Sequence, residues 1–347
     1  MSRADPDLAA QVHAALLTCS APDVIIAAVR HGQEHTAYRG GATEPADGPH
    51  LLFEIGSITK TFTAVLLAHM VDTGEVRLDD PITTYLPPHA IPRDARARAI
   101  TLRHLATHTG GVPHTPARVL WQTTRARTSN VFAHYTTSDL YRTTSRLRPR
   151  TPPGSRYHYS NLGVALLGQL LANAAGTDCK TLLIRRVCHP LGMLETLPDH
   201  PAPPPRSAIG HFRSTPVVPC SMQAFAGAGT LRSNAADLLR YLRAHLDPRT
   251  TPLDTALRAT HVPHVESGGR HQPADQVCLI WNRRTTADGH SVLFHGGATM
   301  GFTAFVGFSP TARTAVALLA NTRRSLLPRP PALVNTAYLL LRRLMSQ

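Results

Sequence analysis

Strand-like and helix-like segments are unevenly distributed along this chain of 347 residues. Apolar runs and apolar–polar alternation, both typical of strands, are confined to the two ends. These runs lie at 23–29, 33–38, 51–54, 277–283, 291–294, 302–308 and 314–320. Strands from both ends predict one antiparallel sheet to which both termini contribute.

Segments with helical periodicity complete the pattern. They lie at 8–17, 59–71, 101–106, 161–175, 181–191, 234–245 and 331–345. The short stretch 226–229, Ala-Gly-Ala-Gly, is expected to be a turn. Together these segments predict an α+β fold. Residues 1–78 and 209–347 form a domain with an antiparallel sheet flanked by helices, and 79–208 form an inserted, mostly helical domain.

Composition narrows the function classes. Hydrophobic residues at 42% and charged residues at 17% indicate a globular protein rather than a disordered one. The formal net charge of +14 implies attraction to acidic partners but says nothing about fold. Because the basic residues are spread widely and no recognition motif is present, no nucleic-acid partner is predicted.

Cysteines and histidines form no recognisable framework. The five cysteines are odd in number and irregularly spaced, which argues against a disulfide scaffold and against a zinc site. The twenty histidines show no ligand spacing such as His-Glu-x-x-His. The sequence therefore predicts no metal and no other cofactor.

The amino-terminal twenty residues contain one arginine and no continuous apolar segment. They are not typical of a signal peptide, and no apolar run in the chain is long enough to span a membrane. The expectation is a cytoplasmic protein without a membrane partner.

A Ser-x-x-Lys pattern at 57–60 begins a predicted helix. Residues three apart on a helix have Cβ atoms about 5–6 Å apart, so the Lys60 amine is expected beside the Ser57 hydroxyl. A serine is a poor nucleophile until a neighbour takes its proton. The spacing predicts that Lys60 activates Ser57, although the pattern alone also fits a capping serine and a surface lysine.

Lysine is rare in this chain. Of 36 lysines and arginines only Lys60 and Lys180 are lysines, which leaves 34 arginines. Arginine is effectively always protonated, whereas a desolvated lysine can lose its proton. We therefore interpret Lys60 as a position that needs an amine, with a solvated helix lysine as the open alternative. Lys180, near a predicted helix start and without a partner motif, is expected to tolerate arginine.

Tyr159 and Asn161 lie at a predicted junction between a loop and a helix. A phenol beside a lysine ammonium can have a lowered pKa and act as a base. Asn161 can donate a hydrogen bond to a substrate carbonyl. The alternative is that Tyr159 packs in the interior and Asn161 caps the helix.

Two His-x-Gly patterns compete for a role at the site. His108 follows a predicted helix and is typical of a turn that ends one. His295 follows a predicted strand, and Gly296 and Gly297 would let a substrate lie along the strand edge. We therefore choose His295.

The three motifs, taken in order, resemble those of the serine β-lactamase-related family. That family includes class C β-lactamases, D-alanyl-D-alanine carboxypeptidases, esterases and acyltransferases. Stretches at 100–111, 227–239 and 301–321 also look like this family, so the resemblance covers nearly the whole chain. It implies a β-lactamase/transpeptidase-like fold with the active site in a cleft between the two domains.

The resemblance also implies roles for individual residues. Ser57 looks like the nucleophile, Lys60 like its proton-relay partner, and Tyr159 like the general base and acid. The backbone N–H groups of Ser57 and Ala298 look like an oxyanion hole. The residues that resemble substrate-binding positions are Asn161, His295, Gly296 and Gly297.

One departure shapes the predicted function. Class C β-lactamases usually carry Lys-Thr-Gly where this chain has His-Gly-Gly, and histidine is common there in the family's esterases, peptidases and transferases. We predict a cytoplasmic serine hydrolase or acyltransferase that cleaves or transfers an ester or amide acyl group through a Ser57 acyl-enzyme. The arginine- and alanine-rich composition resembles that of high-GC actinobacterial proteins. Family members there often serve in natural-product pathways, so the resemblance implies a role in natural-product biosynthesis. An amine or alcohol acceptor and an acidic carrier protein are the candidate partners.

Two alternatives remain open. The first is an exported D-amino-acid peptidase or β-lactamase. The second is a catalytically silent binding protein on the same fold, against which the intact motifs argue.

Overall fold

Both ends of the chain build one antiparallel sheet. The computed structural model describes residues 5–41, 45–116, 119, 132–200, 202, 204–266, 275–325 and 332–346. Eight strands lie in the order β2-β1-β13-β12-β11-β10-β9-β8, and each neighbouring pair is antiparallel. They are β1 Val24–Arg30, β2 Gln33–Arg39, β8 Val265–Glu266, β9 Gln276–Val277, β10 Asn282–Thr285, β11 Ser291–Ala298, β12 Thr303–Ser309 and β13 Thr314–Ala320.

Two small sheets and the helices complete the described fold. The short strands are β3 Phe53–Glu54, β4 Leu197–Pro198, β5 His211–Phe212, β6 Thr215–Pro216, β7 Leu231–Ser233 and β14 Thr322–Arg323. The helices are α1 Pro6–Thr18, α2 Thr59–Asp72, α3 Ala95–Arg98, α4 Leu102–Ala106, α6 Thr137–Ser145, α7 Asn161–Ala174, α8 Cys179–Leu183, α9 Ala226–Gly229, α10 Ala235–Leu246, α11 Asp254–Ala259 and α12 Ala332–Met345. The predicted α+β fold, an antiparallel sheet flanked by helices, is confirmed.

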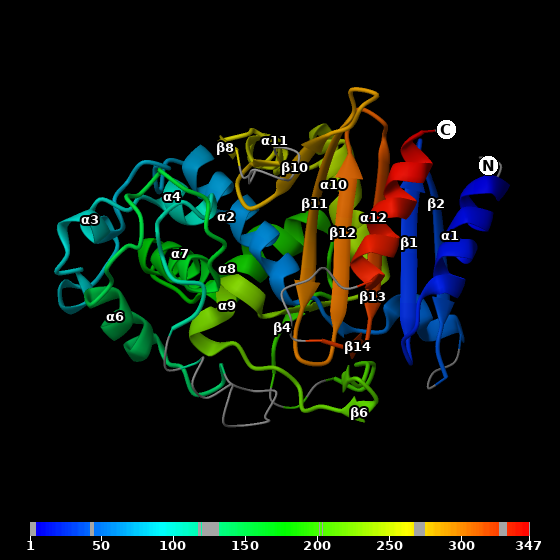
Figure 1. The fold of residues 1–347 in the computed structure, drawn as a ribbon, viewed down its shortest axis with the longest axis horizontal. Helices are drawn as coiled ribbons and strands as arrows, with labels where there is room; N and C mark the ends of the chain where they lie inside the picture. The colour runs from blue at the N-terminus through cyan, green and yellow to red at the C-terminus, as the bar shows by residue number, and fades with distance from the viewer. Residues whose placement is uncertain are drawn as a thin grey trace.

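The central strands are buried on both faces, which explains their continuous apolar runs. Alternate side chains of β1 point to opposite faces, with Ile26 in one buried cluster and Ile25 in another. Helices α1 and α12 pack on the first face and α10 on the second. Figure 1 shows both termini at the same end of this layered part.

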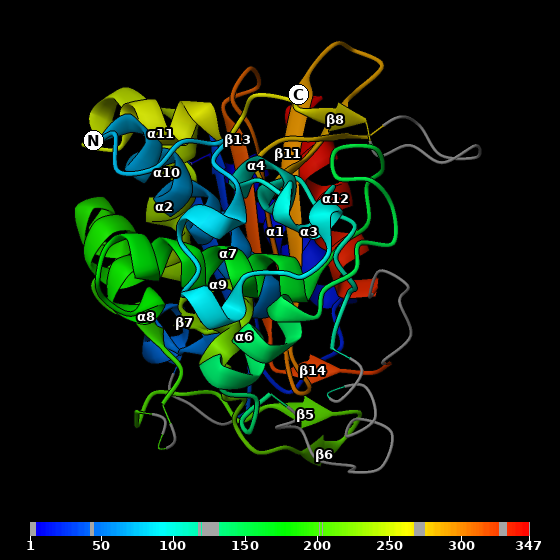
Figure 2. The same cartoon turned by 90° about the vertical axis from the view of Figure 1, so that its left-hand side faces the viewer.

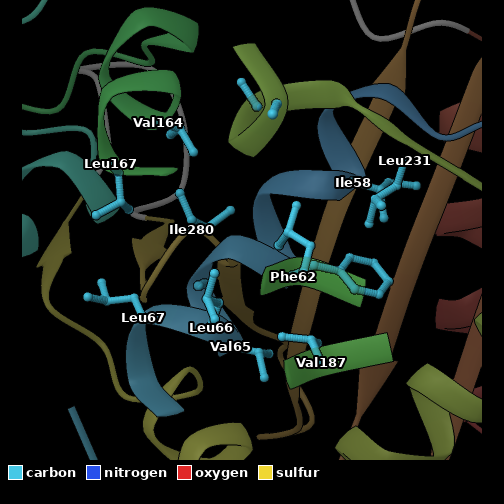
Figure 3. Packing of buried hydrophobic residues seen from close by; sticks show 14 of the residues in the cluster. Ile58, Phe62, Val65, Leu66, Leu67, Val164, Leu167, Val187, Leu231 and Ile280 are labelled. Carbon is cyan, nitrogen blue, oxygen red and sulfur yellow. The ribbon is translucent and has the colours of Figure 1, made fainter. Parts of the chain in front are cut away.

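Helices from the middle of the chain gather on the other side of the molecule, as Figures 1 and 2 show. Helix α2 lies in the interior between this group and the sheet. Figure 3 shows Phe62 and Leu66 of α2 in the same apolar cluster as Val164 and Leu167 of α7. Such a cluster holds the amino-terminal turn of α2 in a fixed position between the two parts of the fold.

Three local predictions need correction. The run 277–283 is not one strand, because β9 and β10 form a hairpin whose turn places Ile280 at φ +68°. The stretch 226–229 is a short helix rather than a turn, and its backbone packs against Gly168. Residues 295–298 do not follow a strand but belong to β11, paired with β12.

Within the described ranges, no helix has the length and apolar character needed to cross a bilayer. The first residue of the predicted helix at 331–345 lies outside the described residues.

Buried histidines make the fold sensitive to acid. His245 and His261 lie with Nδ1 and Nε2 2.8 Å apart, and burial holds the pKa of His245 well below its usual range and lowers that of His261 to about 4. The unfolded chain takes up these protons below about pH 6.5, whereas the folded chain does not. Stability is therefore full above that pH and falls toward pH 4.

We expect the free energy of unfolding to drop by up to about 1.4 kcal/mol per pH unit for each such histidine. Urea titrations between pH 7.5 and 5 measure this slope. The variant His245→Gln removes one titrating group and should show a shallower pH dependence than the wild type. Equal slopes would contradict the assignment.

Candidate active site

Ser57 lies in a tight turn that precedes α2. The turn, Gly56–Ile58, is a single 3₁₀ segment between β3 and α2. Gly56 has φ +50°, and a Cβ there would lie 2.6 Å from the carbonyl oxygen of Ala298. Only glycine permits this approach, so the turn brings Ser57 against the end of β11.

Lys60 is fully buried on the first turn of α2. Its Nζ lies 2.8 Å from Ser57 Oγ and donates a hydrogen bond of 2.8 Å to the carbonyl oxygen of Ala228. Ala228 belongs to the short helix α9, and the Thr63 hydroxyl donates to the carbonyl oxygen of Gly227 in the same helix. Burial lowers the pKa of Lys60 to about 7. Near neutral pH the amine therefore has a lone pair available for the Ser57 proton.

Tyr159 completes a group of three polar side chains. Its hydroxyl is hydrogen-bonded to Ser57, and its ring centroid lies 5.3 Å from Lys60 Nζ. The expectation that the lysine lowers the pKa of Tyr159 is wrong, because burial raises that pKa above its usual value of 10. The phenol is protonated, so in the resting site Lys60 is better suited than Tyr159 to accept a proton.

Asn161 is the first residue of α7, and its side chain is half-buried. The helix cap is Ser160, whose Oγ accepts a hydrogen bond of 2.8 Å from the Gly163 amide. The Asn161 side chain is therefore not the cap that the alternative interpretation required. Its backbone N–H donates to the carbonyl oxygen of His114, which fixes the start of the helix.

His295 is buried in β11, and Gly296, Gly297 and Ala298 follow it on the same strand. Its Nδ1 lies 2.7 Å from the carbonyl oxygen of Gly296, so the neutral ring donates there and keeps Nε2 as an acceptor. Burial and the Lys60 charge lower the pKa of His295 to about 3. A Cβ at Gly297 would lie 2.1 Å from the Ile55 carbonyl oxygen, which requires glycine there.

His108, which sequence reasoning assigned to a helix-ending turn, also lies at this site. It does follow α4, but its buried ring packs 4.6 Å from the ring of Tyr159, measured between centroids. His108 and Tyr159 lie far apart in sequence, so only the fold brings them together. Its pattern, the same His-x-Gly as at His295, was the one signal for a role at the site.

Among the described residues, no group of three or more histidine, cysteine, aspartate or glutamate side chains could hold a metal ion. The polar groups around Ser57 are an amine, a phenol and neutral imidazoles. This arrangement can transfer a proton from the serine, stabilise an oxyanion and protonate a leaving group.

We expect His295→Ala to lower kcat/KM for an activated ester about tenfold to hundredfold, the scale of a lost positioning contact. The reason is the loss of the Nε2 acceptor beside the reacting groups. The matched control is His290→Ala, at the other end of the β10–β11 hairpin, where Nδ1 contacts Thr311. Steady-state kinetics with melting temperatures measures both variants. An unchanged rate in His295→Ala would remove this residue from the site.

Comparisons with known proteins agree with this geometry. A family model described as "Beta-lactamase" matches residues 8–339. The D-alanyl-D-alanine-carboxypeptidase/endopeptidase AmpH of Escherichia coli K12 is 31% identical over 211 residues, which are 59% of this chain and 53% of AmpH. The chain thus matches about half the length of that relative.

Other matches extend over most of the chain. A protein of Escherichia coli K12 described as "Beta-lactamase" is 26% identical over 334 residues, which cover 86% of this chain and 84% of that protein. A solved structure of a class C beta-lactamase has a TM-score of 0.80 at 20% identity and covers 98% of this chain and 96% of its own. That structural likeness confirms the predicted β-lactamase-like fold.

Proposed function

This chain belongs to the beta-lactamase family of serine hydrolases, and we propose that it cleaves or transfers an ester or amide acyl group through an acyl-enzyme on Ser57. The observation that carries the proposal is the position of the Lys60 amine. A fully buried nitrogen with a pKa lowered to about 7 lies 2.8 Å from the Ser57 hydroxyl oxygen. Few arrangements other than nucleophilic catalysis use such a pair.

In the proposed acylation step, Ser57 Oγ forms a bond to the substrate carbonyl carbon and its proton passes to Lys60. The carbonyl oxygen becomes an oxyanion, for which we propose the N–H groups of Ser57 and Ala298 as donors. When the intermediate collapses, the bond to the leaving group breaks and that group takes a proton from Tyr159. The Lys60 ammonium then returns a proton to Tyr159, and the charges balance.

In the proposed deacylation step, water, an amine or an alcohol attacks the acyl-enzyme. Its proton passes to Lys60 by way of the Tyr159 hydroxyl, which gives its own proton to Lys60 as it takes up the new one. The bond between the acyl carbon and Ser57 Oγ breaks, and the Lys60 ammonium returns a proton to Ser57 Oγ. Hydrolysis and transfer differ only in which acceptor reaches the acyl carbon.

The neutral state of His295 supports an ester or amide donor rather than a β-lactam. With a pKa of about 3 its ring is uncharged at neutral pH, so it offers a hydrogen-bond acceptor and no positive charge to a substrate carboxylate. A lysine at that position would offer the charge. The formal net charge of +14 supports an acidic substrate or an acidic carrier protein as partner.

The second candidate is a D-amino-acid peptidase. The similarity to AmpH, described as a carboxypeptidase and endopeptidase, supports it over the 211 matched residues. It shares the Ser57 chemistry and differs in the acyl donor.

A substrate panel distinguishes these functions. It contains activated esters, thioesters, amides, a D-alanyl-D-alanine peptide and a cephalosporin, each with and without a small amine or alcohol acceptor. We expect turnover of esters or thioesters, and amide or new ester products when the acceptor is present. Free acid alone across all acceptors would make the protein a plain hydrolase. Activity confined to the D-alanyl-D-alanine peptide would favour the D-amino-acid peptidase, and activity confined to the cephalosporin would make the protein a β-lactamase.

A further inference from the structure

His108 makes hydrogen bonds with both residues that flank Tyr159. The His158 amide donates to the His108 carbonyl oxygen at 2.7 Å, and the Ser160 amide donates to His108 Nδ1 at 3.2 Å. Tyr159 is thus held between two hydrogen bonds to a single residue. Building on the proposed function, we propose that His108 is a positioning residue that holds the Tyr159 hydroxyl at Ser57.

The ring of His108 also fills the space beside Tyr159. The two ring centroids are 4.6 Å apart with an angle of 40° between the planes, and the Tyr157 and His108 rings meet edge-on with their centroids 5.8 Å apart. A tyrosine supported on one ring face and at both neighbouring amides has few other positions available. The support therefore acts on the placement of Tyr159 and does not require contact with a substrate.

The backbone at His108 indicates that its side chain matters. His108 has φ +57°, in the left-handed region that glycine adopts without cost and most side chains avoid. The turn alone would be more stable with glycine. A bulky imidazole in this conformation is the kind of local strain that accompanies functional positions, which agrees with a positioning role.

The ring must stay neutral to hold Ser160. Nδ1 accepts a hydrogen bond, so the proton of the neutral ring is on Nε2, which is buried and has no hydrogen-bond partner within the described residues. The groups facing the ring are the amine of Lys60, the imidazoles of His114, His158 and His295, and the phenols of Tyr157 and Tyr159. Burial and, after it, repulsion from the charged form of Lys60 hold the pKa of His108 well below its usual range. The acceptor therefore persists across the working pH range.

Two substitutions test the His108 Nδ1 acceptor without disturbing the left-handed backbone at this position. Both asparagine and glycine tolerate a left-handed backbone, and both leave the His108 carbonyl in place. In His108→Asn the side-chain oxygen can take the place of Nδ1, whereas His108→Gly leaves the Ser160 amide without its acceptor. His104→Asn, on α4 but with Nδ1 turned to the Thr101 amide, controls for general disturbance of that helix.

We expect His108→Gly to reduce kcat for an activated ester about tenfold to hundredfold, with KM changed less than about twofold. A displacement of the Tyr159 hydroxyl by about 1 Å lowers the rate of the chemical step by that factor. His108→Asn should stay within about threefold of the wild type, and His104→Asn should match it. Labelling by a fluorophosphonate should slow in His108→Gly yet reach the same end point. Full activity in His108→Gly, or equal losses in the glycine and asparagine variants, would overturn the positioning role.

A second measurement does not depend on activity. Amide hydrogen exchange at Ser160, followed by NMR, should accelerate in His108→Gly and remain slow in His108→Asn. If the Ser160 amide stays equally protected from exchange in His108→Gly, the positioning role of His108 is overturned, even if the enzyme is active. If the wild type is not labelled by a fluorophosphonate but Ser160 exchange changes as expected, the proposed function fails. The hydrogen bonds by which His108 positions Tyr159 are then still supported.

Discussion

Replacing Ser57 with alanine should abolish covalent labelling by a fluorophosphonate and all ester turnover that passes through an acyl-enzyme. The hydroxyl is the only nucleophile in the proposed step, and its Oγ is the atom 2.8 Å from Lys60 Nζ. Residual turnover should come only from the remaining oxyanion donors and substrate binding, which in serine enzymes leaves about 10³–10⁴-fold acceleration over water. Intact-mass spectrometry should show one adduct on the wild type and none on Ser57→Ala.

The matched control for this experiment is Ser155→Ala. Ser155 is exposed, and its hydroxyl donates to the Pro152 carbonyl oxygen rather than to the site. It should label at the wild-type rate. An adduct of equal yield in Ser57→Ala would place the nucleophile elsewhere. A wild type that takes no label with any donor would favour the catalytically silent binding protein.

The apolar pattern predicted one antiparallel sheet built from both ends of the chain, without its strand order. The strand predicted at 314–320 coincides with β13, and the helix predicted at 161–175 differs from α7 by one residue. Long segments of this kind carry their own signal because their periodicity is decided by burial on one or both faces. Strands at both termini then leave few ways to form a single antiparallel sheet.

The errors occur where tertiary contacts decide the local structure. Residues 277–281 are all apolar, but the chain turns at Ile280, whose amide donates to the carbonyl oxygen of Ala106, far away in sequence. The Ala-Gly-Ala-Gly stretch packs as a short helix against α7, where Gly227 and Gly168 let the two backbones approach each other closely. Neither contact is visible in a local pattern.

At the site, too, local spacing was predictable and long-range contacts were not. The Ser-x-x-Lys spacing is local, so the approach of Lys60 to Ser57 followed from helix geometry. The role of His108 could not be derived in this way, since its partners are the amides around Tyr159. The direction of the Tyr159 pKa shift was also missed, because burial raises this pKa more than the hydrogen bond with Ser57 lowers it, and no sequence pattern measures burial depth.

Lys180 also has a long-range contact that no local pattern shows. Sequence reasoning found no partner for it, yet its Nζ lies 2.7 Å from Oδ1 of the buried Asp199. That carboxylate also accepts a hydrogen bond from the Met222 amide. The ion pair joins the start of α8 to the end of β4, so Lys180 contributes to stability rather than to catalysis.

The two lysines therefore provide a test of the proton-transfer step. Lys60→Arg should lower kcat/KM for an activated ester by about 10²–10⁴-fold, the range of general acid–base contributions. Arginine keeps the positive charge but is larger, planar and effectively never deprotonated. It could not take the serine proton, and the space between Ser57 Oγ and the Ala228 carbonyl oxygen fits one nitrogen. Lys180→Arg, which can keep its pair with Asp199, should retain full turnover.

The pH dependence of turnover also reports on the protonation state of Lys60. With its pKa lowered to about 7, Lys60 becomes an ammonium as the pH falls, and an ammonium cannot accept the Ser57 proton. In the wild type, kcat/KM should therefore decline below about pH 7, while residual activity of Lys60→Arg should lack that limb. Melting temperatures at pH 7.5 would exclude unfolding. If Lys60→Arg turned over at nearly the wild-type rate with the same limb, position 60 would supply only charge, and another group would have to accept the proton.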